Sequence, residues 1–166
     1  METQVTPLWV SHRGFRQEAV ENTIASFDAA RALGFSALET DLRLTKDRHL
    51  VLCHDVSFER LGGPKKAVHH MTRKELESLS LNQQNRVLFF DTFMARYKDC
   101  RWIFDTKPEE GEQTIRYFHE YLRQHNCHKT VIKKAWFLLW HKSHEKLLLD
   151  LLPEAVILEG ERSCWR

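Results

Sequence analysis

Several features of exported, membrane-bound and disulfide-linked proteins are missing from this sequence of 166 residues. Residues 1–8 hold no basic segment followed by an apolar run, so no secretory signal is predicted. The most apolar stretch, residues 135–152, is broken by polar residues at 141–146 and is not expected to span a membrane. The four cysteines form no C-x-x-C pair and are expected to be free thiols. We therefore expect a cytoplasmic protein without a transmembrane segment.

The sequence also lacks a strong excess of either charge. Its 25 lysines and arginines nearly balance 23 aspartates and glutamates, which gives a net charge of +2 with neutral histidines. A nucleic-acid-binding protein is expected to carry a basic stripe, so no nucleic-acid partner is predicted. Internal repeats and low-complexity linkers are absent, and the length is enough for one hydrophobic core. We predict a single domain over residues 1–166.

Short apolar runs alternate with segments of helical periodicity along most of the chain. This alternation predicts an α/β fold, in which helical crossovers join the strands of a parallel sheet. In such folds the active site gathers at the carboxyl ends of the strands. Strands are expected at residues 8–10, 37–44, 50–53, 102–104, 130–132 and 155–158, and helices at 24–33, at 72–79, around 115–122 and at 138–152.

Two pairs of polar residues occur at strand positions two apart, so the members of each pair share a face. Glu39 and Asp41 would repel each other unless a cation lies between them, and Ca²⁺ and Mg²⁺ prefer such oxygen ligands. The alternative is a solvated strand face. Asp105 and Lys107 repeat the spacing. If their strand is a neighbour, Asp105 adds a third oxygen, and Lys107 neutralises the carboxylates or holds a phosphate oxygen; the alternative is a surface ion pair.

Two histidines each follow an apolar run and precede a charged residue. His12 precedes Arg13, and His54 precedes Asp55. Histidine titrates near neutrality, so a pair of them can supply the base and the acid that cleavage of a phosphodiester requires. The guanidinium of Arg13 offers a planar fork for phosphate oxygens. The alternative is that these histidines have structural or surface roles, as most histidines do.

Taken together, these motifs resemble the signature of the glycerophosphodiester phosphodiesterase family. The resemblance is dense over residues 8–108 and thinner to about residue 158. The matching motifs are His12-Arg13-Gly14, Glu21-Asn22-Thr23, Glu39-x-Asp41, Thr45-Lys46-Asp47, His54-Asp55, Arg60, Thr72-x-x-Glu75-Leu76-x-x-Leu79 and Asp105-x-Lys107.

The resemblance implies a TIM-barrel-type fold and a divalent cation, Ca²⁺ or Mg²⁺. It also implies hydrolysis of a small-molecule glycerophosphodiester to sn-glycerol 3-phosphate and an alcohol. The attacking group is either the substrate's own glycerol hydroxyl or a water molecule. By position, the resemblance implies that His12 and His54 are the catalytic acid/base pair, that Glu39, Asp41 and Asp105 are metal ligands, and that Arg13 and Lys107 contact the phosphate.

The sequence departs from the family pattern in two ways that matter. Asp105 stands where many family members have glutamate. Related sphingomyelinase D-like enzymes also use aspartate there, so a lysophospholipase D-like or sphingomyelinase D-like activity is an alternative. A full barrel needs about 250 residues. We therefore expect an incomplete barrel of about five of the eight βα units, without the C-terminal units. Its open edges would allow self-association, and a non-catalytic barrel fragment is the third alternative.

Overall fold

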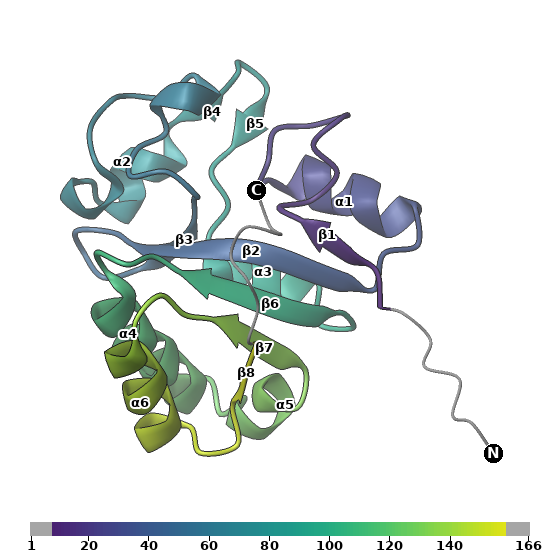
Figure 1. Ribbon diagram of the computed structural model, residues 1–166. Helices are drawn as coiled ribbons and strands as arrows, with labels where there is room; N and C mark the ends of the chain where they lie inside the picture. Colours follow the sequence, from purple (N-terminus) through teal and green to yellow (C-terminus); the bar gives the residue numbers. More distant parts are fainter. Residues whose placement is uncertain (1–7, 159–166) are drawn as a thin grey trace.

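The sheet of the computed structural model, which describes residues 8–158, has its parallel strands in chain order (Figure 1). They lie in the order β1-β2-β6-β7-β8, and β3 is added antiparallel to β2. A helix precedes each new parallel strand, which confirms the predicted α/β fold. The strands of this sheet are β1 (Val10–His12), β2 (Ala37–Leu44), β3 (Leu50–Leu52), β6 (Arg101–Thr106), β7 (Ala135–Leu138) and β8 (Val156–Ile157).

Most of the helices pack against this sheet. In Figure 1, α3 lies behind the sheet, and α4, α5 and α6 gather beside β6 and β7. Phe27, Phe104, Phe118 and Phe137 meet in the core between the helices and the sheet. The helices are α1 (Ile24–Ala32), α2 (Arg73–Glu77), α3 (Phe90–Arg96), α4 (Gly111–Gln124), α5 (His128–Ile132) and α6 (Lys142–Leu151).

Capping boxes begin two of the helices. At α1, the Thr23 hydroxyl accepts from the Ser26 amide, and the Ser26 hydroxyl accepts from the Thr23 amide. At α2, Thr72 and Glu75 exchange the same pair of hydrogen bonds. Gly34 lies just beyond the end of α1 and has a φ of 89°, a conformation that favours glycine.

The segment between β3 and α3 forms a subsidiary layer, at the upper left of Figure 1. A second hydrophobic cluster, which includes Phe58, Val68 and Leu76, holds it together and joins it to Val51 in β3. The arrangement lets a long connection stay ordered next to the end of the sheet. Its elements are η1 (Glu59–Leu61), η2 (Val68–His70), α2, β4 (Ser80–Leu81) and β5 (Asn85–Arg86).

The strand expected at residues 130–132 is wrong. These residues belong to α5, and Val131 and Ile132 are buried. The strand is β7, which begins three residues after Ile132, pairs with β6 from Ala135 opposite Trp102 and buries Phe137. The β-branched run at 130–132 suggested a strand, but burial against the helical layer prevailed over local propensity. Because Leu138 ends β7, the predicted helix at 138–152 begins only at Lys142.

The other predicted strands agree with β1, β2, β3, β6 and β8, with ends shifted by up to two residues. No helix within residues 8–158 combines the length and apolar character that crossing a bilayer requires. Cys53, Cys100 and Cys127 are free thiols, while Cys164 and residues 1–7 lie outside the described residues.

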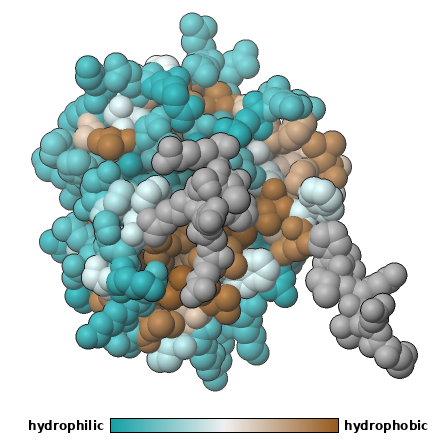
Figure 2. Space-filling view, in the orientation of Figure 1, coloured by the Kyte–Doolittle hydropathy of each residue, from teal (hydrophilic) through white to brown (hydrophobic). Residues whose placement is uncertain are grey.

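The path of the described sheet ends at β1 and β8. Figure 2 shows the molecule in the orientation of Figure 1. Hydrophilic side chains cover most of the side in view, and apolar side chains reach the surface over β7 and β8. Val156 in β8 is among the exposed apolar residues. Self-association through these strand edges stays a prediction.

Candidate active site

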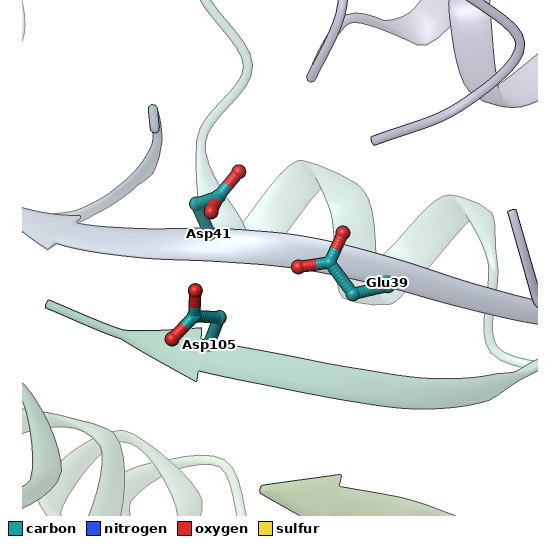
Figure 3. A group of neighbouring side chains, drawn as sticks. All are labelled: Glu39, Asp41 and Asp105. Atoms are coloured by element: carbon teal, nitrogen blue, oxygen red, sulfur yellow. The ribbon is translucent and has the colours of Figure 1, made fainter. Parts of the chain in front are cut away.

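Three carboxylates meet on the face of the sheet opposite the hydrophobic core (Figure 3). Strands β2 and β6 are parallel neighbours, and their register places Asp41 directly opposite Asp105. Glu39 lies two residues before Asp41 and shares its face. One oxygen from each of the three lies within 4.8 Å of the others. Strands β2 and β6 are therefore neighbours, as a metal site that includes Asp105 requires. The alternative of a solvated strand face is wrong, because Glu39 is 1% and Asp41 0% exposed.

Lys107 places its ammonium between two of these carboxylates. Its Nζ donates to Asp105 Oδ2 over 2.8 Å and also to Asp41 Oδ1. Burial opposes its charge, but the two carboxylates outweigh burial and raise the pKa of Lys107. Of the two roles considered for Lys107, the structure thus shows the neutralisation of the carboxylates. The alternative of a surface pair is wrong, since the side chain is 4% exposed.

Asp41 has the richest set of partners. Arg13 Nε lies 3.0 Å from Asp41 Oδ2, and Asn22 Nδ2 donates to the same oxygen over 2.9 Å. Asn22 Oδ1 in turn accepts from the Thr40 hydroxyl over 2.8 Å. Burial alone would raise the pKa of Asp41, but Lys107 and Arg13 more than offset it and lower this pKa. Asp41 is therefore held as an anion in a fixed orientation.

Glu39 is less well compensated. Its Oε2 accepts from the backbone N–H of Arg13 over 3.2 Å and lies 3.7 Å from His12 Nε2. Burial, then the negative charges of Asp41 and Asp105, raise the pKa of Glu39 well above its usual range. The three side chains thus offer clustered oxygen ligands with more negative charge than the nearby lysine and arginine fully stabilise. This donor set fits a hard divalent cation.

The turn after β1 sets the position of His12 and Arg13. Arg13 has a φ of 61° and Gly14 a φ of 83°, and a Cβ at Gly14 would lie 2.3 Å from Ser26 Oγ. Glycine is therefore required where this turn meets α1. Burial and then the charge of Arg13 lower the pKa of His12 to about 4, so its imidazole is neutral near pH 7 and can accept a proton.

His54 lies in the loop after β3 and has partners of its own. Its Nδ1 is 2.7 Å from Asp55 Oδ1. Its carbonyl accepts from Arg43 Nε over 3.3 Å and from Arg43 Nη2 over 3.0 Å. Arg43 is the next β2 residue on the face of Glu39 and Asp41, and Glu110 accepts from its Nη1 over 3.1 Å. One strand therefore both carries two carboxylates and anchors the His54 loop.

Two site residues were not identified from the sequence. Thr23 caps α1, and the neighbouring Asn22 orients Asp41. Trp140 Nε1 donates to Asp105 Oδ1 over 2.9 Å. Membership of the Glu21-Asn22-Thr23 motif was a signal for Asn22. Trp140 follows β7 by two residues, so its place just beyond a strand end was the available signal.

Comparisons with known proteins match most of the chain. The model of the glycerophosphoryl diester phosphodiesterase family matches residues 12–148. A glycerophosphodiester phosphodiesterase from Caldanaerobacter subterraneus subsp. tengcongensis is 40% identical over 72 residues, which are 43% of this chain and 30% of that protein. A lysophospholipase D from Rattus norvegicus is 43% identical over 54 residues, which are 32% of this chain and 17% of that protein. The matched segment thus spans less than two thirds of these relatives.

Solved structures match over a larger part of the chain. A glycerophosphodiester phosphodiesterase from Agrobacterium tumefaciens has a TM-score of 0.76 at 21% identity, and the match covers 90% of this chain and 65% of that one. A phosphodiesterase from Oleispira antarctica, in complex with the product sn-glycerol-3-phosphate, has a TM-score of 0.78 at 24% identity, over 96% of this chain and 69% of that one. This likeness confirms the predicted fold, an incomplete TIM-barrel type with five parallel strands among the described residues.

Proposed function

The chain belongs to the glycerophosphoryl diester phosphodiesterase family, and we propose that it hydrolyses glycerophosphodiesters to sn-glycerol 3-phosphate and an alcohol with the help of a divalent cation. The observation that carries this proposal is the buried group of Glu39, Asp41 and Asp105 at the carboxyl end of the sheet. The relative from Oleispira antarctica that binds sn-glycerol-3-phosphate supports the substrate class. We propose that residues 1–166 form one domain.

Glu39, Asp41 and Asp105 would hold the cation, Ca²⁺ or Mg²⁺. A bound divalent cation polarises a phosphoryl oxygen and stabilises the charge that develops on it. The raised pKa of Glu39 supports this role, because a buried carboxylate next to two others gains the most from a nearby positive charge. The protein side of the site is already in place, since Lys107 and Asn22 hold Asp41 and Trp140 holds Asp105.

His12 and His54 would share the proton transfers. The neutral imidazole of His12, beside Glu39, would take the proton from the attacking hydroxyl or water. Asp55 accepts from Nδ1 of His54, so the doubly protonated imidazolium form of His54 would give its Nε2 proton to the departing alkoxide. Arg13 and Lys107 would contact the phosphate, because both cations adjoin the carboxylates at the place where the anionic substrate would lie.

The release of sn-glycerol 3-phosphate from glycerophosphocholine tests the proposal. We expect turnover with Ca²⁺ or Mg²⁺ that a chelator abolishes, and a large loss in Asp41→Asn and His12→Ala. Asp150→Asn, at an exposed position in α6, is the matched control and should retain full activity. Absence of turnover by the folded protein at any concentration of either metal would favour a non-catalytic barrel fragment. Turnover that survives His12→Ala would contradict the role of that histidine.

A second candidate is a lysophospholipase D-like activity. The likeness to the lysophospholipase D from Rattus norvegicus and the aspartate at position 105 both favour it. The related sphingomyelinase D-like activity would use the same residues. Comparing kcat/KM for glycerophosphocholine, lysophosphatidylcholine and sphingomyelin separates the three. Preference for an acylated substrate would replace the first proposal while leaving the assigned residues in place.

A further inference from the structure

Arg60 joins two acidic residues that come from separate loops. It lies in η1, and its guanidinium donates from Nε to Asp55 Oδ2 over 2.6 Å. On its other side, Nη2 donates to Glu21 Oε1 over 2.6 Å and Nη1 to Glu21 Oε2 over 3.3 Å. A planar guanidinium directs N–H groups from three separate nitrogens, so it can hold two carboxylates that lie apart in fixed directions, whereas a lysine ammonium donates from a single nitrogen. Arg60 is therefore a bridge between the loop after β1 and the loop after β3.

Each end of this bridge continues to a residue assigned to the reaction. Glu21 Oε1 also accepts from Arg13 Nη1 over 3.4 Å, and Arg13 reaches Asp41. Asp55 uses its other oxygen, Oδ1, to bind His54 Nδ1. Since a carboxylate can only accept, the His54 ring must carry its proton on Nδ1 in this contact. Arg60 thus stands at the centre of a continuous chain of charged hydrogen bonds that runs from Arg13 to His54.

We propose that Arg60 is a positioning residue, which acts through Asp55 to set the ring orientation and tautomer of His54. The inference rests on the proposed function. Asp55 accepts from both Arg60 and His54, so the guanidinium fixes the direction in which this carboxylate faces the imidazole. The other carboxylate, Glu21, is 6% exposed, so one end of the bridge is anchored in the interior and not on a mobile surface side chain.

A matched surface arginine separates this role from that of an ordinary ion pair. Arg96 is 49% exposed, close to the 51% of Arg60, and donates from Nε and Nη2 to both oxygens of Asp28. We expect Arg60→Met to lower kcat by about 10- to 100-fold, the usual effect of losing a residue that orients a reacting group. Arg96→Met should leave kcat unchanged. Arg60→Lys should not restore kcat, because one ammonium cannot span Asp55 and Glu21.

Combining substitutions shows whether Arg60 acts through Asp55. Asp55→Ala removes the acceptor of His54 Nδ1, so adding Arg60→Met to it should cause little further loss of kcat. If the kcat losses of Asp55→Ala and Arg60→Met multiply in the double variant, Arg60 does not act through Asp55, and the proposal is overturned. Should Arg60→Met fail to fold by circular dichroism, Arg60→Lys, which keeps the charge, takes its place in the same cycle.

A readout without turnover keeps this inference distinct from the proposed function. Nitrogen NMR of the His54 ring should show a proton on Nδ1 in the wild type and in Arg96→Met, and a mixture of tautomers in Arg60→Met. If the wild type has no turnover but its tautomer depends on Arg60, the proposed function fails and the positioning role of Arg60 stands. If Arg60→Met and Arg96→Met share the same kcat and the same His54 tautomer, the inference is wrong.

Discussion

The two faces of β2 are equally buried but built from opposite chemistry. All eight residues of the strand are buried. Leu38, Leu42 and Leu44 belong to the core between the sheet and the helices. Glu39 and Asp41 alternate with them and meet Asp105 across the sheet. Apolar burial stabilises the fold, whereas burial of a carboxylate costs stability unless charges and donors compensate it. One strand therefore supports the fold on one face and carries the candidate site on the other.

The polar face is compensated unevenly. Asp41 has Lys107, Arg13 and Asn22 as partners, and its pKa is lowered. Glu39 has no such set, and its pKa is raised. The difference shows where the metal-free protein bears the largest electrostatic cost. It also indicates that a divalent cation would contribute most of its stabilisation at Glu39 and Asp105, whose pKa burial also raises.

Glu39→Gln should have the largest effect, and in opposite directions for activity and stability. Loss of one of the three proposed ligands should reduce metal-dependent turnover by about 10³-fold, roughly 4 kcal/mol of barrier. Without metal, the same substitution should stabilise the fold by removing a buried charge. Steady-state kinetics and urea unfolding measure the two effects. Retained turnover would remove Glu39 from the ligand set.

The pH dependence of Glu39 follows from the same charge. Because its folded pKa is raised, the folded state holds this proton more tightly than the unfolded state does. Metal-free stability should therefore decline as the pH rises above about 4.5, the ordinary value, and Glu39→Gln should remove that part of the decline. Urea unfolding from pH 4 to pH 8 in chelator measures it. Identical slopes for the two proteins would contradict the assignment.

Lys107→Met should destabilise the metal-free protein by about 3–5 kcal/mol, because it leaves two buried carboxylates without their shared cation. Ca²⁺ or Mg²⁺ should recover a larger share of stability in this variant than in the wild type, since the added cation faces less competing positive charge. Urea unfolding with and without each metal measures both. An equal gain in the two proteins would contradict competition between Lys107 and the metal.

Leu42→Ala tests the opposite face of the same strand. Leu42 is 1% exposed in the core, so truncation should cost about 2–5 kcal/mol of stability through lost burial and a cavity. The kcat of the fraction that remains folded should be unchanged, because the side chain points away from Asp41. Kinetics well below the unfolding midpoint provide the check. A large fall in kcat would show that the two faces are mechanically coupled.

Thr72 lies outside both faces of β2, so Thr72→Ala should have the smallest effect on stability and activity. Its hydroxyl caps α2 by accepting from the Glu75 amide, and loss of such a cap costs about 1 kcal/mol. Thr72→Ser keeps the hydroxyl and serves as the control. Thermal unfolding and glycerol 3-phosphate release measure both variants, and activity should match the wild type. A loss of activity would link the subsidiary layer to the site.

Much of the site was predictable because its parts are local patterns. The two-residue spacing of Glu39 and Asp41 and of Asp105 and Lys107 placed each pair on one face. The order of the motifs indicated the family, and the family model bears that out. The helix over residues 130–132 was not predictable, because a short β-branched run fits a strand or a buried helix equally well. The placement of Trp140 beside Asp105 joins residues 35 apart, which no local pattern encodes.

By itself, the sequence determined the alternation of strands and helices, the helix caps and the identity of the charged residues, since these depend on neighbours within a few positions. Only the tertiary structure decided which charges share a site. The parallel register of β2 and β6 set Asp41 opposite Asp105 and placed the Lys107 ammonium between them. Burial then strengthened the interactions between these charges and shifted their pKa values, because the energy of an ion in a protein depends on the surroundings that the whole fold builds.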